Sequence, residues 1–258
     1  MKKNNPLVSI IMNCFNGEKY LKESLTSIIN QSYTNWELIF WDNKSTDQSS
    51  QIIKKTVDKR INYYCSDNFE KLYKARNLAL EKASGDFICF LDTDDFYDKD
   101  FIKKHLDKIL ESDCDIVYSK YFIKNEINNK IHINKKKNLP SGLITKNLLR
   151  DNLVGISVVF LRRKVFDVKK FNPNYEIIGD FDFFLRLSLT TKFYSLQEPL
   201  LTYRHHKNNF TNKFNNIFIN ELKFWIKENE KLLNNKYSTK FLRLKILKLQ
   251  IKNIFKIL

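Results

Sequence analysis

Three aspartates crowd the end of an apolar run in the stretch FLDTDD, residues 90–95. Carboxylates packed this closely repel one another unless a positive charge lies among them. A hard divalent cation, Mg²⁺ or Mn²⁺, is held by oxygen ligands of this kind. In an extended chain Asp92 and Asp94 share one face and Asp95 points to the other, so one face could serve a metal and the other could brace the loop. An acidic turn that caps the next helix would give the same pattern.

A second acidic pair, Asp180 and Asp182, lies on the helix predicted over 180–191. Residues two apart on a helix cannot share a face, so only one of them should meet a substrate. We favour Asp180, at the helix start, although a carboxylate there could simply cap the first turn. A carboxylate that takes the proton of an attacking hydroxyl typically contributes about 10²–10⁴-fold. A metal stabilises a departing diphosphate as a Lewis acid, so group transfer to a hydroxyl needs two separate acidic stations.

The segments around the first station alternate between strand-like and helix-like patterns. The predicted strands are 7–15, 36–41, 61–65 and 86–91, and the helices between them are 20–30, 48–58 and 72–83. This alternation is typical of an α/β, Rossmann-like, mostly parallel sheet with helices on both faces. Ligands bind such sheets at the carboxyl ends of the strands. Residues 13–16, 42–47 and 92–95 follow three of those ends, so polar and acidic side chains should gather at one edge.

The second half of the chain continues the same α/β pattern and then changes. A helix over 100–111 and a strand over 115–123 are predicted, followed by a Lys/Asn-rich hairpin or loop over 124–138. Apolar segments near 154–161 precede the helix of Asp180. We expect one domain over 1–212, with a nucleotide-binding half to about 98 and an acceptor half from about 99, and a basic helical tail over 213–258.

Composition narrows the class of protein. The 258 residues are 43% hydrophobic and 14% aromatic, as in a folded globular protein. The four cysteines are scattered without a CxxC pair, which predicts reduced thiols in a cytoplasmic protein and no zinc site. We find no signal peptide and no apolar run of about 18 residues, so a transmembrane helix is not expected. The net charge of +16 would suit phosphates or an anionic membrane, but no nucleic-acid-binding motif is present, so nucleic acid is not an expected partner.

Four segments occur in a fixed order: VSIIMNCFNGEKYLKESLTSIINQSYTNWELIFWDNKSTD, KARNLALEKASGDFICFLDTDD, IGDFDFFLRLS and PLLTYRHHKNN. Together they resemble the family 2 glycosyltransferases, which are inverting enzymes of the GT-A fold that use nucleotide-diphosphate sugars. The resemblance covers about residues 6–211. It implies a nucleotide-sugar donor, a glycan or lipid-linked acceptor, and a role in building a surface polysaccharide or lipooligosaccharide.

The resemblance also implies roles for residues at the matching positions. Asp94 would be the direct metal ligand, with Asp92 nearer the ribose but sharing the metal, and Asp95 able to take either role. His206 matches the histidine of the family's Tyr-Arg-x-His segment, beside the diphosphate and the metal. Asp180 would be the catalytic base. The remaining predicted substrate-binding residues are Asn13, Phe15, Asn16, Asp42, Asn43, Arg76, Asp182 and Arg186.

Some positions depart from the family pattern. Asn13-Cys14 replaces a usual Pro-Thr, Asn43 stands where an acidic residue is common, and Gly179 stands where Glu often precedes the base. Uridine remains the expected base of the donor. Two alternatives stay open at this point: a sugar nucleotidyltransferase, which would need a Gly-rich basic loop that NCFNGEKY does not provide, and a non-catalytic nucleotide-sugar-binding module.

The tail carries Lys245, Lys248, Lys252 and Lys256 as one helical stripe among Leu, Ile and Phe. Such a helix could lie on an anionic membrane surface, where each lysine contributes about 1 kcal/mol. It could instead pack on the domain or on a partner subunit. The first alternative would make the protein cytoplasmic but peripheral on the inner membrane face.

Overall fold

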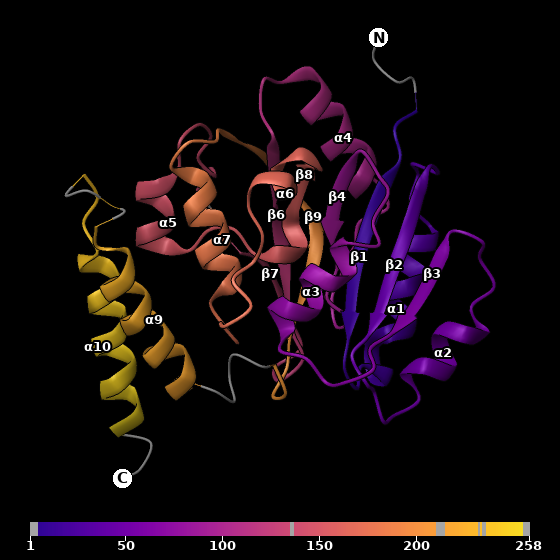
Figure 1. The fold of residues 1–258 in the computed structure, drawn as a ribbon, viewed down its shortest axis with the longest axis horizontal. Helices are drawn as coiled ribbons and strands as arrows, with labels where there is room; N and C mark the ends of the chain where they lie inside the picture. Colours follow the sequence, from indigo (N-terminus) through magenta and orange to yellow (C-terminus); the bar gives the residue numbers. More distant parts are fainter. Residues whose placement is uncertain (1–4, 135–136, 210–214, 232, 234–235, 255–258) are drawn as a thin grey trace.

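One twisted sheet runs through the protein, and helices cover both of its faces (Figure 1). The structure is a computed structural model and describes residues 5–134, 137–209, 215–231, 233 and 236–254. The strands are β1 (Val8–Cys14), β2 (Trp36–Asp42), β3 (Ile61–Cys65), β4 (Phe87–Phe90), β5 (Phe96–Tyr97), β6 (Ile116–Asn125), β7 (Lys130–Ile133), β8 (Val159–Arg162) and β9 (Phe193–His205).

The helices fall into two layers and a C-terminal pair. They are α1 (Glu18–Ile29), α2 (Ser49–Lys55), α3 (Leu72–Leu80), α4 (Phe101–Glu111), α5 (Thr145–Asp151), α6 (Lys164–Val168), α7 (Gly179–Ser188), α9 (Asn215–Asn229) and α10 (Lys240–Ile254). Apolar residues of α1, α2 and α4 form the core on one face of the sheet. Those of α3, α5, α6 and α7 form the core on the other.

The sheet order is β3-β2-β1-β4-β8-β6-β9-β5, with β7 paired to β6. The first four strands are parallel, and β8 then runs antiparallel between β4 and β6. Residues of β1 and β2 are almost all buried because helices cover both faces, which explains their continuous apolar runs. Cys14 pairs with Asp42, so β1 and β2 end at the same level and the polar residues that follow share one edge.

The α/β, mostly parallel sheet is confirmed, and so are the first four predicted strands. The strands β5 and β8, which run antiparallel to their neighbours, and β9, which runs parallel to β6, were not predicted as such. The Lys/Asn-rich segment 124–138 is the hairpin of β6 and β7 over its described part, up to residue 134. The tail is two helices rather than one, and the last part of its predicted lysine stripe, at Lys256, lies outside the described residues.

The C-terminal helices are built into the domain. Trp225 of α9 is fully buried, and Leu242 and Ile246 of α10 are buried in the same apolar cluster as α3 and α7. The Trp225 indole Nε1 donates to Asp182 Oδ1 of α7 at 3.0 Å. In Figure 1, α9 and α10 lie against α5 and α7, away from β1–β3. The tail therefore shares its core with the predicted glycosyltransferase domain.

A shared core predicts that damage to the tail destabilises the far side of the sheet. Trp225→Ala should lower the free energy of unfolding by about 3–5 kcal/mol. The chain has three tryptophans, so this variant leaves only Trp36 and Trp41, both in β2, as fluorescence reporters in urea unfolding. The neighbouring Phe224→Ala is the control, because Phe224 is 56% exposed. An unchanged midpoint of the β2 signal in Trp225→Ala would mean that the tail folds independently.

Candidate functional site

A cavity of about 670 Å³ opens at the carboxyl ends of β1, β2 and β4. Its size falls within the range of small-molecule sites. Its lining residues are Asn13, Cys14, Phe15, Asn43, Phe69, Glu70, Lys71, Leu72, Ala75, Arg76, Asp92, Thr93, Asp94, Glu176, Tyr203 and Asn209. The sheet edge where we expected a ligand is therefore hollowed, and six of the predicted residues line it.

The three aspartates after β4 form a tight turn rather than an extended segment. The Asp95 N–H donates to the Asp92 carbonyl at 3.1 Å. Asp92 and Asp94 line the cavity, whereas Asp95 is buried behind them. Asp92 and Asp94 thus lie apart from Asp95, as expected, but the reason we gave for it, the alternation of side chains along a strand, is wrong. The metal role of Asp92 and Asp94 stays a prediction.

Arg76 of α3 supplies the positive charge beside Asp92. Its Nη2 lies 2.7 Å from Asp92 Oδ1, and the Arg76 side chain is almost fully buried. A buried guanidinium needs a paired carboxylate, so this ion pair fixes Asp92 against α3. Because Arg76 also lines the cavity, its remaining N–H groups lie beside the space that a ligand would fill.

Asp94 is held from the other side by the loop after β9. His206 Nε2 lies 3.0 Å from Asp94 Oδ2, and Asn209 Nδ2 donates to the same oxygen at 3.3 Å. Burial raises the pKa of Asp94, the Asp92 charge raises it further, and the hydrogen bond with His206 opposes both. The predicted pairing of Asp94 with His206 is therefore present as a contact between the two side chains.

Arg204 of β9 holds the buried third carboxylate. Its backbone N–H donates to Asp95 Oδ1 at 3.0 Å, and its Nε donates to the Asp94 carbonyl at 2.9 Å. The same guanidinium is paired with Glu126 and Glu23. Burial, followed by the charges of Asp94 and then Asp92, raises the pKa of Asp95 well above its usual range. Asp95 is thus a brace for the turn and does not line the cavity.

Two aromatic rings lie at the mouth of the cavity. The rings of Phe15 and Phe69 meet edge to face, with 4.7 Å between their centroids. Phe15 is 50% exposed and Phe69 is 60% exposed. The amide Nδ2 of Asn13 is buried in the cavity wall, and among the described residues it has no hydrogen-bond partner. A buried donor without a partner is costly, so it points to a ligand oxygen.

Asn43 lines the cavity but uses its own amide on the protein. It donates to the Glu70 carbonyl at 2.7 Å and accepts the Glu70 N–H at 3.1 Å. This pair of bonds fixes the loop that carries Phe69 and Lys71, two lining residues that the sequence did not single out. They lie in a loop without a motif. Tyr203 and Asn209 did lie in a quoted motif, but we assigned them no role.

Asp42 and Asn16 do not line the cavity. Asp42 is buried, accepts the Tyr63 hydroxyl at 2.9 Å and accepts the Ser45 N–H at 2.8 Å. Asn16 adopts a left-handed backbone and accepts the Thr46 N–H at 2.8 Å. Both side chains shape the loop after β2, and their predicted contact with a nucleotide stays a prediction.

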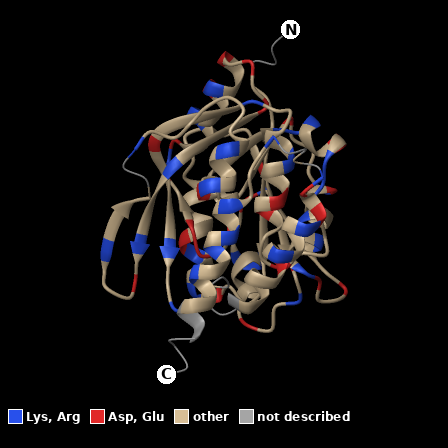
Figure 2. Ribbon diagram, turned by 90° about the vertical axis from the view of Figure 1, so that its left-hand side faces the viewer, with Lys and Arg blue, Asp and Glu red and all other residues tan. Residues whose placement is uncertain are grey.

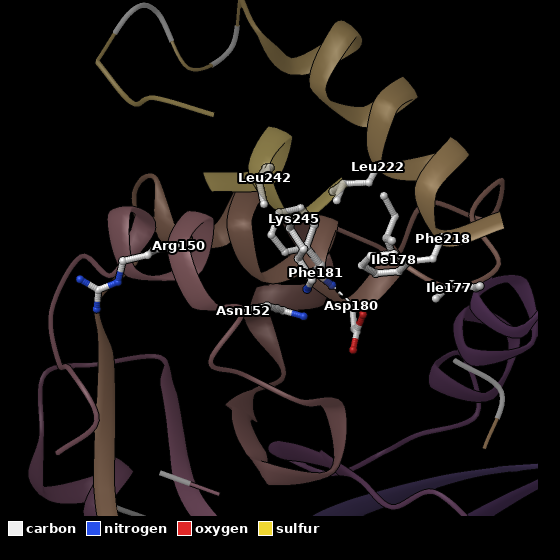
Figure 3. A pocket seen from close by; sticks show the side chains of 10 residues that line it. All are labelled: Arg150, Asn152, Ile177, Ile178, Asp180, Phe181, Phe218, Leu222, Leu242 and Lys245. Atoms are coloured by element: carbon white, nitrogen blue, oxygen red, sulfur yellow. Dashed lines mark hydrogen bonds between the residues drawn. The ribbon is translucent and has the colours of Figure 1, made fainter. Parts of the chain in front are cut away.

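Asp180 stands at the start of α7 and lines a second cavity of about 120 Å³ (Figure 3). Its Oδ1 accepts the Phe181 N–H at 2.7 Å and lies 3.3 Å from the Tyr73 hydroxyl. Burial raises the pKa of Asp180, and the charge of Arg76 lowers it. Through Tyr73 and Arg76 of α3 the carboxylate is close to the large cavity, although it lines the small one.

Tyr73 explains why residue 179 is a glycine. A Cβ atom at Gly179 would lie 2.4–2.5 Å from three carbons of the Tyr73 ring. The ring therefore fills the space that a larger residue before Asp180 would need. The absence of the family's glutamate at this position follows from the close packing of α3 on α7.

Asp182 and Arg186 bind other parts of the protein, and their predicted contact with a substrate stays a prediction. Asp182 is buried, with Oδ1 bound to Trp225 and Oδ2 bound to Arg186 at 2.8–2.9 Å. Arg186 also donates to the Lys170 carbonyl. Neither residue lines a cavity that holds a candidate site, because α7 turns this face toward α9.

Known proteins are similar to this chain in sequence and in fold. Residues 9–169 match the family model described as glycosyl transferase family 2. An uncharacterized glycosyltransferase of Haemophilus influenzae is 36% identical over 184 residues, which are 70% of this chain and 72% of the relative. The Escherichia coli UDP-Glc:alpha-D-GlcNAc-diphosphoundecaprenol beta-1,3-glucosyltransferase WfgD is 32% identical over 71% of this chain and 69% of its own.

Solved structures support the fold. Residues 1–349 of Staphylococcus aureus TarS in complex with UDP-GlcNAc superpose with a TM-score of 0.67 and 20% identity, over 85% of this chain and 66% of TarS. A Pyrobaculum calidifontis mannosyltransferase in complex with GDP-Man and Mn²⁺ gives a TM-score of 0.66 and 13% identity, over 95% of this chain and 70% of its own. The GT-A architecture is thereby confirmed.

The packing of Tyr73 on Gly179 predicts that adding a side chain at residue 179 lowers the stability of the protein. Gly179→Ala should lower the free energy of unfolding by about 1–3 kcal/mol, because the new methyl group must displace the Tyr73 ring. Gly155→Ala is the matched control, since nothing lies within 4 Å of a Cβ at that position. Equal urea midpoints for the two variants would contradict the packing of Tyr73 on Gly179.

Proposed function

Because the chain belongs to glycosyl transferase family 2, we propose that it moves a sugar from a nucleoside-diphosphate donor to an acceptor hydroxyl, with inversion at the anomeric carbon. The observation that carries this proposal is the pair of acidic sites. Asp94 lines the large cavity, Asp180 lines the small one, and Arg76 and Tyr73 lie between them. Relatives that are named glycosyltransferases favour transfer over the nucleotidyltransferase and binding-module alternatives.

The proposed donor is a UDP-sugar carrying a hexose or an N-acetylhexosamine. The name of WfgD gives UDP-Glc as its donor, and TarS is solved with UDP-GlcNAc. Phe15 and Phe69 offer faces on which a base can stack. The Asn13 amide offers a donor to a base or ribose oxygen, and Arg76 offers charge to the diphosphate.

Asp180 is the proposed base. It accepts the proton of the acceptor hydroxyl as the oxygen attacks the anomeric carbon from the side opposite the nucleoside diphosphate. Burial raises its pKa, which makes it a stronger proton acceptor than an exposed aspartate. The Phe181 N–H and the Tyr73 hydroxyl both hold Oδ1, so the position of the carboxylate is fixed before a substrate arrives.

Asp94 and His206, with Asp92, are the proposed ligands of Mg²⁺ or Mn²⁺. Oxygen and imidazole donors 3.0 Å apart suit such a metal. Across the described residues no group of three or more His, Cys, Asp or Glu side chains is arranged to hold a metal by itself, so donor phosphates would complete the coordination. When bound, the metal would stabilise the negative charge of the leaving diphosphate.

Mutations at the two acidic sites should have different effects on donor binding and on turnover. Asp180→Asn should reduce kcat by about 10²–10⁴-fold and leave the affinity for UDP-sugar unchanged. Asp94→Asn should weaken Mn²⁺-dependent donor binding itself. Release of UDP with and without Mn²⁺, together with calorimetric binding, measures both effects. Asp107→Asn, an exposed residue of α4, is the control. Full activity in both variants would refute the mechanism.

The raised pKa of Asp180 also sets a pH limit. Activity needs the carboxylate form, so kcat/KM should fall as the pH drops through a value above the ordinary aspartate range. The groups that face Asp180 are Tyr73 and Arg76 of α3, Asp92 after β4 and Lys245 of α10. The Asp180→Asn variant should lose most of its activity, and the activity that remains should not show this fall at low pH.

We propose that the acceptor is a lipid-linked glycan and that the protein acts at an anionic membrane surface. The name of WfgD specifies a diphosphoundecaprenol acceptor. Within the described ranges, none of the helices has the length and apolar character needed to cross a bilayer. A surface helix is therefore the feature of this chain that can bring it to lipid, and α10 has the required composition.

The outward face of α10 is apolar. Leu244, Leu247 and Ile251 are 44–52% exposed. At about 100° per residue they lie opposite the buried Leu242. Lys240 lies within this stripe, and Lys248 lies beside it. Residues 213–258 contain 11 Lys or Arg and three Glu, a net +8 and half of the +16 of the chain. Figure 2 views the side where α9 and α10 lie and shows basic residues recurring along the helices there. Apolar side chains flanked by lysine fit an anionic headgroup layer.

Vesicle flotation tests this surface. The protein should bind phosphatidylglycerol-containing vesicles and lose binding to pure phosphatidylcholine or in 0.5 M salt. Leu244→Ser with Leu247→Ser should weaken binding at least about tenfold. Val57→Ser is the control, since Val57 is fully exposed at the end of α2. If the leucine variant instead breaks a dimer in light scattering and leaves vesicle binding intact, the face pairs with a second copy and the proposal fails.

A further inference from the structure

The loop that leads into Asp180 is held by a residue of the C-terminal helices. Glu221 of α9 accepts three consecutive backbone N–H groups, those of Glu176, Ile177 and Ile178, at 2.5, 3.0 and 3.1 Å. These three residues precede Gly179, the first residue of α7. The N-cap residue Ile178 makes no side-chain hydrogen bond that caps the helix. Glu221 therefore supplies from another helix the acceptor and the negative charge that a helix N-terminus requires.

A second contact holds the other side of Asp180. Trp225 lies four residues after Glu221, on the same face of α9, and donates its indole N–H to Asp182. The two side chains thus hold the loop at 176–178 and α7 at 182, on either side of the proposed base. Trp225 is fully buried, so α9 cannot shift without breaking the core.

The small cavity beside Asp180 is also built by these helices. Phe218 and Leu222 of α9 and Leu242 and Lys245 of α10 line it together with Asp180 (Figure 3). The Lys245 ammonium lies 5.0 Å from the Phe218 ring centroid. Eight of the ten residues that line this cavity thus lie beyond 169, where the family match ends, and the other two are Arg150 and Asn152.

We propose that Glu221 is a positioning residue for the base Asp180, with Trp225 as its support, and that α9 is in this sense part of the acceptor site. The inference rests on the proposed function in taking Asp180 as the base. A carboxylate that caps α7 from α9 fixes where Asp180 stands relative to the large cavity. A displacement of about 1 Å at such a group can cost 10²-fold in rate.

Glu221→Gln tests the inference, because the amide keeps the size of the side chain but cannot accept all three N–H groups. We expect kcat for transfer to fall about 10–100-fold, with KM and calorimetric affinity for UDP-sugar unchanged. Hydrogen exchange at the amides of Ile177 and Ile178 should quicken. Glu228→Gln, an exposed glutamate of the same helix, should change none of these quantities.

The outcomes are separable. If the wild-type protein transfers sugar and Glu221→Gln does so equally well, or loses donor affinity as much as kcat, the positioning role is refuted and the proposed function stands. If the wild type has no transfer activity, the proposed function fails, and unchanged exchange at 177 and 178 would refute the cap as well. Trp225→Phe keeps the buried ring and removes one hydrogen bond, so a lower kcat at unchanged KM in that variant supports the role even if Glu221→Gln folds poorly.

Discussion

The mutual repulsion of three carboxylates at the end of β4 is the constraint around which this site is assembled. Asp92, Asp94 and Asp95 lie in one turn. Asp94 is partly buried and Asp95 is fully buried. Arg76 pairs with the first, and Arg204 binds the backbone of the second and the carboxylate of the third. Arg76 thus supplies a charge partner for Asp92, whereas Arg204 holds the turn through two hydrogen bonds, because its guanidinium charge is paired with Glu23 and Glu126.

The two arginines come from distant parts of the chain, and the packing of the sheet brings both of them to the turn. Arg76 lies on α3, which packs on β1 and β2, whereas Arg204 belongs to the long strand β9. The antiparallel pair of β5 and β9 brings Arg204 over the turn, because β5 begins one residue after Asp95. Arg76 pairs with Asp92 and the Arg204 backbone N–H binds Asp95, whereas Asp94 lies at the cavity with His206, where the proposed cation and diphosphate would meet it.

The C-terminal helices complete the other half of the site. The family match ends at residue 169, before Asp180, yet α9 caps and clamps the helix that carries this carboxylate. The outward side of α10 is apolar and basic while its inward side lines the cavity of Asp180. The same pair of helices thus carries the surface that we propose binds lipid and part of the lining beside the proposed base.

The sequence alone determined the first four strands, their alternation with helices, and the edge where the polar residues gather, because these follow from local periodicity and from the rule that strand ends carry ligands. It also separated Asp180 from Asp182, since two residues on a helix cannot share a face. Only the tertiary structure decided that Asp182 binds Arg186 and Trp225 and that Asp42 and Asn16 bind the loop after β2. It also decided that Phe69 lines the cavity and that Glu221 binds the loop before Asp180. Those roles depend on which distant element packs against each face, and no local pattern in the chain records that choice.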